Sequence, residues 1–286
     1  MIKVSYLISY DYCMLLTSVK LLYQYVDKII IAIDKDFKTW SGNTFEIPDS
    51  FFDEVSNYDT RNIIEFYFDT FFIPSLNPSQ CESRERNMVL KKLGGGWKIQ
   101  LDVDEYIYDF YKVKKYLSKY WYLNLFPKYT PLCIHGNLIT LYRELPSGFL
   151  FIDNNESFPF ITNQTSNVQT RRNDNIRNHN SNIQVIHQSW ARSEKEIFIK
   201  IKNWGHKDDF DTNKYYKFWK NINSSNYNNY QNIHPIFPEI WGELNFISTI
   251  SIDDFIKKYS IQHPQILKDL PVIKILKSAI KKIIRR

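Results

Sequence analysis

Asp102 and Asp104, in the segment LDVDEY, have a residue type and a spacing that could bind a metal ion. They follow a run of apolar residues typical of a buried strand, and side chains two apart on a strand point to the same face. Both carboxylates could therefore bind one hard cation such as Mg²⁺ or Mn²⁺. We expect Asp104 to be exposed at the end of this strand. A plainer interpretation, a pair of solvated loop acids, stays open at this point.

Two other reactions use closely spaced acids, and both fit the segment less well. A phosphatase of the haloacid dehalogenase type would carry its aspartates after the first strand and follow them with a small residue. Here the pair follows a fourth predicted strand, and the next residue is Glu105. A glycosidase needs its two carboxylates on opposite sides of the bond, at least ~5 Å apart. Neighbours on one strand face are better suited to sharing a metal ion.

Basic side chains and histidines occur in two further segments. The first, ESRERN, carries Arg84 and Arg86 near a predicted helix start, where guanidinium groups could meet a diphosphate or a base edge. A solvated helix face would explain them as well. The second, VIHQSWARSEKEIFIKIKNWGH, is rich in phosphate-binding residue types: His187, Arg192, Lys200 and His206. Histidine is also an acceptable ligand for Mn²⁺.

The elements that must position these residues alternate between strand and helix in the first hundred residues. The apolar patterns predict strands at 3–9, 28–33, 63–68 and 97–103, and helices at 14–25, 49–58 and 82–93. This alternation predicts an α/β fold with a mostly parallel central sheet flanked by helices. Ligands bind such sheets at the carboxyl ends of the strands. The residues there are Ser9, Asp34 and the LDVDEY aspartates.

The rest of the chain has a different character. Helices are expected at 109–120 and 193–203, and strands at 132–143, 149–153 and 183–187. Residues 163–182 are rich in asparagine and predict a long loop, either a mobile lid or a disordered segment. Residues 221–232 have the composition of a polar linker. Asp153 and Glu156 follow a strand and are candidates for a catalytic base, although a surface turn explains them better.

Composition places the chain among globular proteins, because 43% of its 286 residues are hydrophobic and 16% are aromatic. Its three cysteines form no CxxC, which favours a reducing compartment. The N-terminal residues are not typical of a signal peptide, and no uncharged apolar run approaches the ~20 residues of a membrane span. We therefore expect a cytoplasmic protein.

The positive charge is confined to the C-terminal end. Residues 265–286 carry seven Lys or Arg against one Asp, which equals the net charge of +6 of the whole chain. The neutral body argues against a nucleic-acid partner. In residues 271–286, apolar residues follow the i, i+3, i+4, i+7 spacing of one helical face, and basic residues occupy the remaining positions. This amphipathic pattern predicts peripheral attachment to the anionic inner face of the cell membrane. The alternative is a helix that packs on the body with its lysines in water.

In this order, the segments resemble the GT-A glycosyltransferases, and more narrowly the bacterial family-two-type enzymes that build surface polysaccharides. The resemblance covers about residues 1–210 and is carried by the strand that ends in Asp34, by SRERN, by QLDVDEY and by IHQSWARSEKEI with KNWGH. It implies a nucleotide-diphosphate sugar donor, with a UDP-sugar expected, and a divalent cation, Mn²⁺ or Mg²⁺. The acceptor hydroxyl would belong to a glycan or lipid-linked molecule in capsule, lipopolysaccharide or lipid-linked oligosaccharide synthesis.

The resemblance also implies roles by position. The residues that would bind the donor are Ser9, Asp34, Arg84, Arg86, Asp102, Arg192, Lys200 and His206. The residues that would bind the metal are Asp102, Asp104 and His187. Family members often have DxDD, whereas Glu105 and Tyr106 follow here, and no motif marks the base. An inverting single displacement is expected from the resemblance.

The domain organisation implied by the resemblance is a GT-A catalytic domain at 1–220, with a donor half at 1–106 and an acceptor half at 107–220. A linker at 221–232 and a C-terminal helical extension at 233–286 would follow. Two other functions stay open. One is a non-catalytic carbohydrate- or membrane-binding protein on the same fold. The other is a nucleotidyltransferase, although no glycine-serine nucleotide signature precedes the acids.

Overall fold

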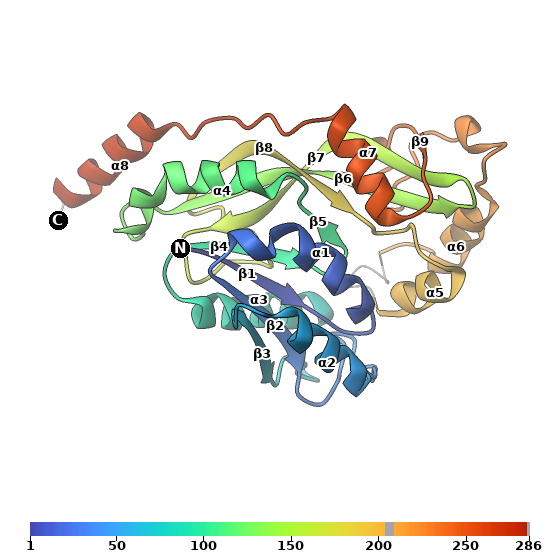
Figure 1. The fold of residues 1–286 in the computed structure, drawn as a ribbon, viewed down its shortest axis with the longest axis horizontal. Coiled ribbons are helices and arrows are strands. Elements are labelled where there is room, and N and C mark those ends of the chain that lie inside the picture. Colours follow the sequence, from blue (N-terminus) through green and yellow to red (C-terminus); the bar gives the residue numbers. More distant parts are fainter. Residues whose placement is uncertain (204–208, 285–286) are drawn as a thin grey trace.

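The computed structural model describes residues 1–203 and 209–284, apart from the side chains of Asn154 and Asn155. In these described residues, the nine strands form one sheet, with helices on both sides of it (Figure 1). The strand order is β3-β2-β1-β4-β7-β6-β8-β5, and β9 pairs with β7. The predicted α/β architecture, a central sheet flanked by helices, is therefore confirmed.

The first four strands are parallel neighbours, as the sequence predicts. They are β1 (Ile2–Leu7), β2 (Lys28–Asp34), β3 (Ile64–Asp69) and β4 (Trp97–Asp102). The helices that connect them are α1 (Leu15–Leu22), α2 (Asp49–Tyr58) and α3 (Pro78–Leu93). Residues 29–33 of β2 are fully buried because helices cover both faces of a parallel sheet, which explains its continuous apolar run.

The second part of the sheet is partly antiparallel. Strands β6 (Leu132–Leu145) and β7 (Gly148–Thr162) form a long hairpin, and β7 pairs antiparallel with β4. Strand β8 (Arg177–His187) lies parallel to β6, and the short β5 (Glu105–Tyr106) and β9 (Asn245–Ser248) complete the sheet. A Cβ at Gly148 would lie 2.1 Å from the carbonyl oxygen of Ile247, so only glycine allows β9 to approach β7 here.

The predicted loop at 163–182 is wrong for residues 177–182, which belong to strand β8. Backbone hydrogen bonds to β6 form whatever the side chains are, so a polar strand carries no apolar pattern to reveal it. The asparagines are used instead for bonds between strands. The amide of Asn180, for example, donates to Oδ1 of Asn137 at 2.8 Å.

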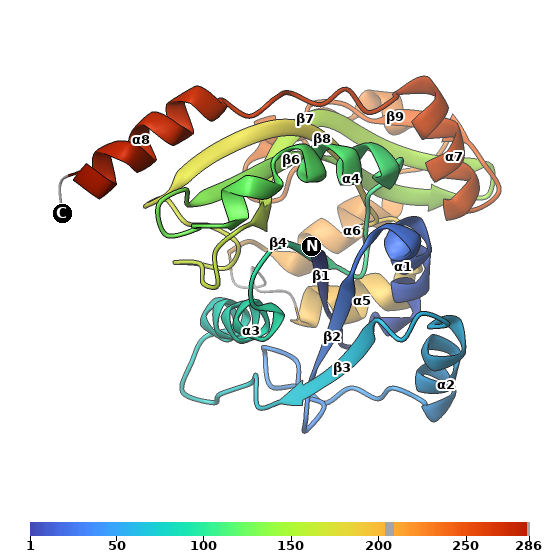
Figure 2. The same cartoon turned by 60° about the vertical axis from the view of Figure 1, so that its left-hand side comes forward.

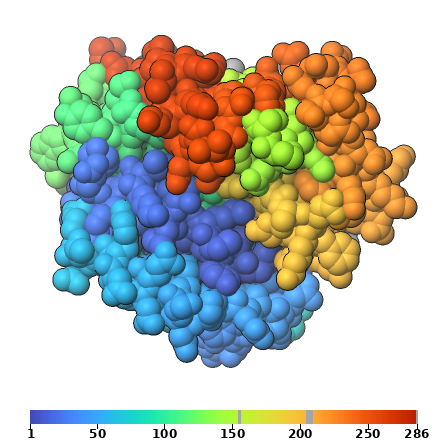
Figure 3. All heavy atoms as spheres, turned by 45° about the vertical axis from the view of Figure 1, so that its right-hand side comes forward, coloured from blue at the N-terminus to red at the C-terminus, as the bar shows by residue number. Residues whose placement is uncertain are grey.

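The C-terminal part packs on the body. Ile222, within the predicted linker, is fully buried in a cluster with Trp219 and Trp241. The remaining helices are α4 (Phe110–Lys119), α5 (Glu194–Asn203), α6 (Thr212–Asn221), α7 (Ile252–Gln262) and α8 (Val272–Ile284). Figure 3 shows the orange and red C-terminal segments packed directly against the blue and green body. Strand β9 extends the central sheet itself.

Candidate active site

The candidate site lies at the carboxyl edge of the parallel strands. Strand β1 pairs with β2 on one side and with β4 on the other, so the ends of the three strands lie next to one another. The chain that leaves them carries Ser9, Asp34 and the two aspartates of LDVDEY. Residues from three separate segments thus come to one edge of the sheet.

Asp102 and Asp104 do not share a strand face. The prediction that they do is wrong, because β4 ends at Asp102 and residues 103–104 form a turn, in which side chains do not alternate between two faces. Glu105 closes this turn: its Oε2 accepts a hydrogen bond from the backbone N–H of Asp102 at 3.0 Å. The two aspartates consequently bind different partners.

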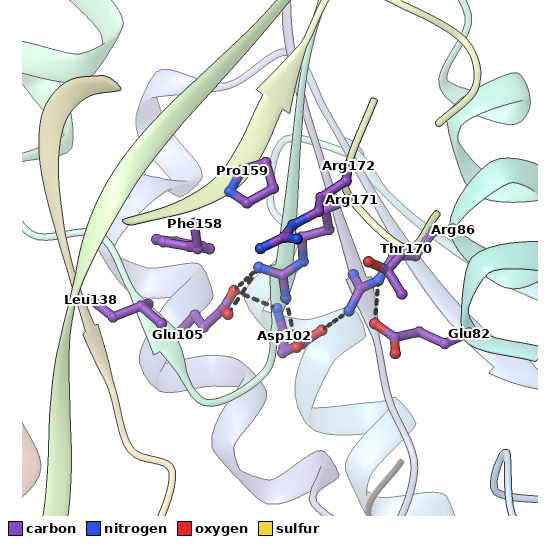
Figure 4. Close-up of a pocket in the computed structure, with 10 residues that line it drawn as sticks. All are labelled: Glu82, Arg86, Asp102, Glu105, Leu138, Phe158, Pro159, Thr170, Arg171 and Arg172. Carbon is purple, nitrogen blue, oxygen red and sulfur yellow. Dashed lines mark hydrogen bonds and ion pairs between the residues drawn. The ribbon is translucent and has the colours of Figure 1, made fainter. Parts of the chain in front are cut away.

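Asp102 is held between two arginines. Its Oδ1 lies 2.8 Å from Nη2 of Arg86, and its Oδ2 lies 2.6 Å from Nη2 of Arg171. The other end of the Arg171 guanidinium contacts both carboxylate oxygens of Glu105, at 2.9 and 3.0 Å. Figure 4 shows the Arg171 guanidinium lying between Glu105 and Asp102. Such forked contacts fix the planar guanidinium in one orientation.

Arg171 was not predicted from the sequence, and helix α3 explains how it reaches the site. The helix begins at a capping box, with Asn77 as N-cap and Pro78 at its first position. The hydroxyl of Ser83 accepts a hydrogen bond from the backbone N–H of Thr170 at 2.8 Å. One turn further along, Asn87 exchanges two hydrogen bonds with the backbone of Asn167, at 2.6 and 3.2 Å. The SRERN motif thus anchors the segment that carries Arg171.

Asp104 has a second set of basic partners, and it is buried. Its Oδ2 accepts a short hydrogen bond from Nη2 of Arg192. His187 Nε2 lies 3.4 Å and Lys200 Nζ 3.7 Å from the same oxygen. Only 4% of Asp104 is exposed, so the predicted exposed position is wrong. The reason is that the turn after β4 directs this carboxylate inward, toward the end of β8 and helix α5.

The electrostatics of the two aspartates follow from these partners. Burial alone would raise the pKa of Asp104, but His187, Arg192 and Lys200 outweigh it and hold that pKa well below its usual range. Arg171 and Arg86 overcome burial in the same way and lower the pKa of Asp102. Both aspartates are therefore ionised. Burial and the neighbouring Arg192 lower the pKa of Lys200 to about 8.

A cavity of about 210 Å³ opens beside Asp102 (Figure 4). Its polar wall is made of three arginines and three acids: Arg86, Arg171, Arg172, Glu82, Asp102 and Glu105. Leu138 of β6 and Phe158 of β7 form an apolar wall. Nη1 of Arg86 is buried, and neither of its two N–H groups has a hydrogen-bond partner in the described part of the chain.

Asp34 and Ser9 lie near this edge but have local partners. The carboxylate of Asp34 is buried and accepts four backbone N–H bonds, from Asp36, Lys38, Phe71 and Phe72, at 2.8–3.2 Å. These bonds join the loop after β2 to the loop after β3, so Asp34 has a structural role. The hydroxyl of Ser9 donates to Asp11 at 3.3 Å. Their predicted contacts with a nucleotide stay predictions.

Other predicted site residues lie apart from the two aspartates. Arg84 donates to the carbonyl of Thr70, so Arg86 is the member of the arginine pair that binds Asp102. On the β7 strand, Asp153 accepts from the hydroxyl of Tyr259 at 2.7 Å, and Glu156 accepts from the indole of Trp241 at 3.2 Å. The predicted donor residue His206 falls outside the described residues.

The side chains around Asp104 fit a divalent cation only together with a substrate. The carboxylate of Asp104 and the imidazole of His187 are adjacent and are ligand types that Mn²⁺ accepts. In the described ranges, no three carboxylate, imidazole or thiol side chains are grouped to bind a metal. A cation with one or two protein ligands commonly takes further oxygens from substrate phosphates. Both oxygens of Asp102 contact arginines, and its role as a metal ligand stays a prediction.

Comparison with known proteins gives only distant similarities. No family model and no curated protein sequence matches the chain. Among solved structures, a mannose-6-phosphate isomerase from Helicobacter pylori is 15% identical over 53% of this chain and 55% of that one, with a TM-score of 0.30. S. aureus TarS 1-349 is 15% identical over 57% and 47%, with a TM-score of 0.31. A mannose-1-phosphate geranyltransferase from Thermus thermophilus is 11% identical over 57% and 50%, with a TM-score of 0.27.

The chain spans about half the length of each of these structures. Similarities at this level carry no argument about activity. The function therefore has to be inferred from the residues at the carboxyl edge of the sheet.

Proposed function

We propose that the chain is a glycosyltransferase that moves a sugar from a nucleotide-diphosphate sugar to an acceptor hydroxyl. The observation that carries the proposal is the convergence of basic side chains on two ionised aspartates at the carboxyl edge of the sheet. The basic side chains are Arg86, Arg171, Arg192 and Lys200, with His187 beside them. They come from helix α3, from the segment between β7 and β8, and from the segment that runs from the end of β8 into α5. The contacts with the aspartates hold them in place before any ligand arrives.

The chemistry of glycosyl transfer explains why such a cluster would be useful. Breaking the sugar–phosphate bond leaves a nucleoside diphosphate with additional negative charge. Positive groups that are already oriented stabilise this charge as it develops, without a cost of reorganisation. Arg192 and Lys200 are buried, so their charges act in a medium that screens them less than water does.

A divalent cation, Mn²⁺ or Mg²⁺, is part of the proposal. Asp104 and His187 would hold it together with oxygens of the donor diphosphate. When bound, such an ion supplies Lewis-acid stabilisation and a template for the two phosphates. The salt bridge between Arg192 and Asp104 would then have to rearrange, which places Arg192 next to the same diphosphate.

The donor and acceptor follow from the family resemblance and are proposed on that basis. The donor would be a UDP-sugar, and the acceptor a glycan or lipid-linked molecule of bacterial surface polysaccharide synthesis. The cavity beside Asp102 supports a polar ligand there, because it has arginine and carboxylate groups on one wall and Phe158 on another.

The catalytic base is proposed among the carboxylates of β7, for an inverting displacement. Glu156 pairs with Leu138 in the sheet, and Leu138 lines the cavity, so Glu156 is nearer to the proposed site than Asp153 is along the strand. A positioned carboxylate base typically contributes roughly 10²–10⁴ in rate. Rotation of Glu156 away from Trp241 would be needed for this role.

The proposal is tested by thermal-shift measurements with nucleotides and nucleotide sugars, with and without Mn²⁺, followed by a donor-turnover assay. We expect nucleoside diphosphates and their sugars to raise the melting temperature more with Mn²⁺ than without it. Asp104→Asn should remove the Mn²⁺-dependent part of the shift. Asp53→Asn, an exposed aspartate on α2, is the matched control and should leave it unchanged.

The outcomes separate this function from its alternatives. Donor binding without turnover under any acceptor condition would favour a non-catalytic binding protein on the same fold. Release of pyrophosphate from a nucleoside triphosphate and a sugar phosphate would indicate a nucleotidyltransferase. If neither nucleotides nor nucleotide sugars shift the melting temperature, the site does not bind a nucleotide and the proposal is wrong.

A further inference from the structure

Helix α8 has two apolar stripes, and the fold uses only one of them. Ile275 and Ala279 face the body and are 3% and 6% exposed, and Ile275 belongs to the main core cluster. The second stripe remains 40–77% exposed and follows the helical repeat of three and four residues. Its members are Ile273, Leu276, Ile280, Ile283 and Ile284. Packing on the body therefore does not explain the apolar character of this helix.

The position of α8 is fixed by the chain that leads into it. The hydroxyl of Tyr116 on α4 donates to the carbonyl of Lys268 at 3.0 Å. Lys119 and the hydroxyl of Tyr120 both contact Asp269 at 2.7 Å. These bonds tie the start of α8 to the C-terminal end of α4. The exposed stripe is thus presented in a defined orientation.

A second exposed apolar element lies beside α8. Helix α4 is followed by residues 121–126, where Trp121 is 59%, Leu125 57% and Phe126 67% exposed. Figures 1 and 2 both show the segment after α4 next to α8, at the same end of the molecule. Tryptophan and phenylalanine are side chains that settle at the boundary between lipid headgroups and acyl chains.

The positive charge of helix α8 indicates the kind of surface that the helix would bind. Helix α8 exposes four lysines beside its apolar stripe: Lys274, Lys277, Lys281 and Lys282. The sequence adds Arg285 and Arg286, which lie outside the described residues, and residues 265–286 account for the whole net charge of +6. A second copy of the same chain would bring like charges together in a two-fold interface. Anionic lipid headgroups are complementary to these charges.

We propose that α8 and residues 121–126 form one membrane-docking surface, which lies in the interface of a bilayer that contains anionic lipids. The aliphatic stripe and Trp121 would enter the headgroup region, while the lysines contact the lipid phosphates. None of the helices in the described part of the chain is both long and apolar enough to cross a bilayer. This docking goes beyond the proposed transferase activity and does not depend on it.

The test is flotation of the full chain with vesicles of phosphatidylcholine alone or of phosphatidylcholine with phosphatidylglycerol. We expect binding to the anionic vesicles at low salt and release at high salt. Lys274→Gln with Lys281→Gln should weaken binding about 25-fold, or about fivefold per lysine. The control pair is Lys214→Gln with Lys217→Gln on α6, both exposed, which should bind as the wild type does.

Three further variants test the apolar part. Ile273→Ser with Ile280→Ser, and separately Trp121→Ser with Phe126→Ser, should each weaken binding at unchanged melting temperature, because these side chains are exposed. The control is Ile250→Ser with Ile261→Ser, which removes two aliphatic side chains outside the proposed surface that are 95% and 72% exposed. This pair should leave vesicle binding unchanged.

Equal binding of the variants and the wild type would overturn the proposal, as would equal binding to both kinds of vesicle. A dimer in sedimentation equilibrium that Ile273→Ser with Ile280→Ser dissociates, without vesicle binding, would instead assign the stripe to a second copy of the chain. Donor turnover measured without vesicles should be the same in all these variants. The docking surface and the transferase activity can therefore fail independently of each other.

Discussion

The guanidinium of Arg171 contacts both carboxylate oxygens of Glu105, at 2.9 and 3.0 Å, and its other nitrogen contacts Asp102 at 2.6 Å. This connects a polar segment between β7 and β8 to the turn at the end of β4. Burial raises the pKa of Glu105, although the charge of Arg171 opposes the rise. Arg171 thus favours the charged form of Glu105, and burial opposes it.

Removal of Arg171 should therefore cost more stability than removal of its neighbour. Arg171→Ala leaves Glu105 buried without its cation, and we expect a loss of about 3–5 kcal/mol in the free energy of unfolding. Arg172→Ala changes an exposed side chain and should stay within about 0.5 kcal/mol. Urea denaturation gives both values. In a double-mutant cycle, Glu105→Gln should recover part of the loss, and strict additivity would show that the pair is not coupled.

The second prediction concerns Asp104. Asp104→Asn should abolish donor turnover, because it removes the negative charge that orients Arg192, Lys200 and His187. It should also destabilise the fold by about 3 kcal/mol, since buried cations lose their partner. The folded-state pKa of Asp104 is depressed, so its contribution is present above the unfolded pKa of 3.8 and is lost as pH falls through the folded pKa.

Turnover assays and urea denaturation at pH 7 and at pH values below 4 check this prediction. The stability difference between wild type and Asp104→Asn should shrink toward zero in acid. A difference that stays constant with pH would show that Asp104 is not held ionised by its partners. Turnover that survives exhaustive EDTA treatment would separately contradict the proposed role of a cation.

The parallel half of the fold could be predicted because each of its strands is defined by a pattern of neighbouring residues in the sequence. The apolar run before Asp34 and the apolar run before Asp102 each define a strand, and parallel pairing brings their ends together. The SRERN motif predicted arginines that meet a diphosphate or a base edge, and the pairing of Arg86 with Asp102 was not predicted. It follows from α3 packing beside β4 with this face turned toward the strand end.

What could not be predicted depends on contacts between distant parts of the chain. Arg171 and Asp102 are 69 positions apart, and no periodic pattern marks the segment that joins them. Strand β8 begins among asparagines, whose pairing uses the backbone and leaves no apolar signal. The burial of Asp104 depends on Arg192 and Lys200 arriving from beyond β8. One sequence feature could have indicated Arg171: it stands next to Arg172 in a segment that is poor in apolar residues.

The third prediction concerns the anchoring of residues 163–176 by α3. Ser83→Ala with Asn87→Ala removes the side-chain bonds to Thr170 and Asn167, so trypsin should cut after Arg171 or Arg172 several times faster. A nucleotide-sugar donor should slow the cut if the segment closes over it. The control is Ser56→Ala with Asn57→Ala on α2, both exposed. Equal cutting with and without donor would contradict a role as a lid.

The last prediction concerns Lys200, whose pKa burial and Arg192 lower from 10.5 to about 8. If its positive charge stabilises the leaving diphosphate, kcat/KM should fall as pH rises above about 8, because that profile reports the pKa of the free enzyme. Stability should respond in the opposite direction and rise between pH 8 and 10.5, because only the unfolded state holds the proton there. Lys200→Arg should move the alkaline limb to higher pH, whereas Lys202→Arg, exposed on the same helix, should not. An unchanged limb in Lys200→Arg would assign it to another group.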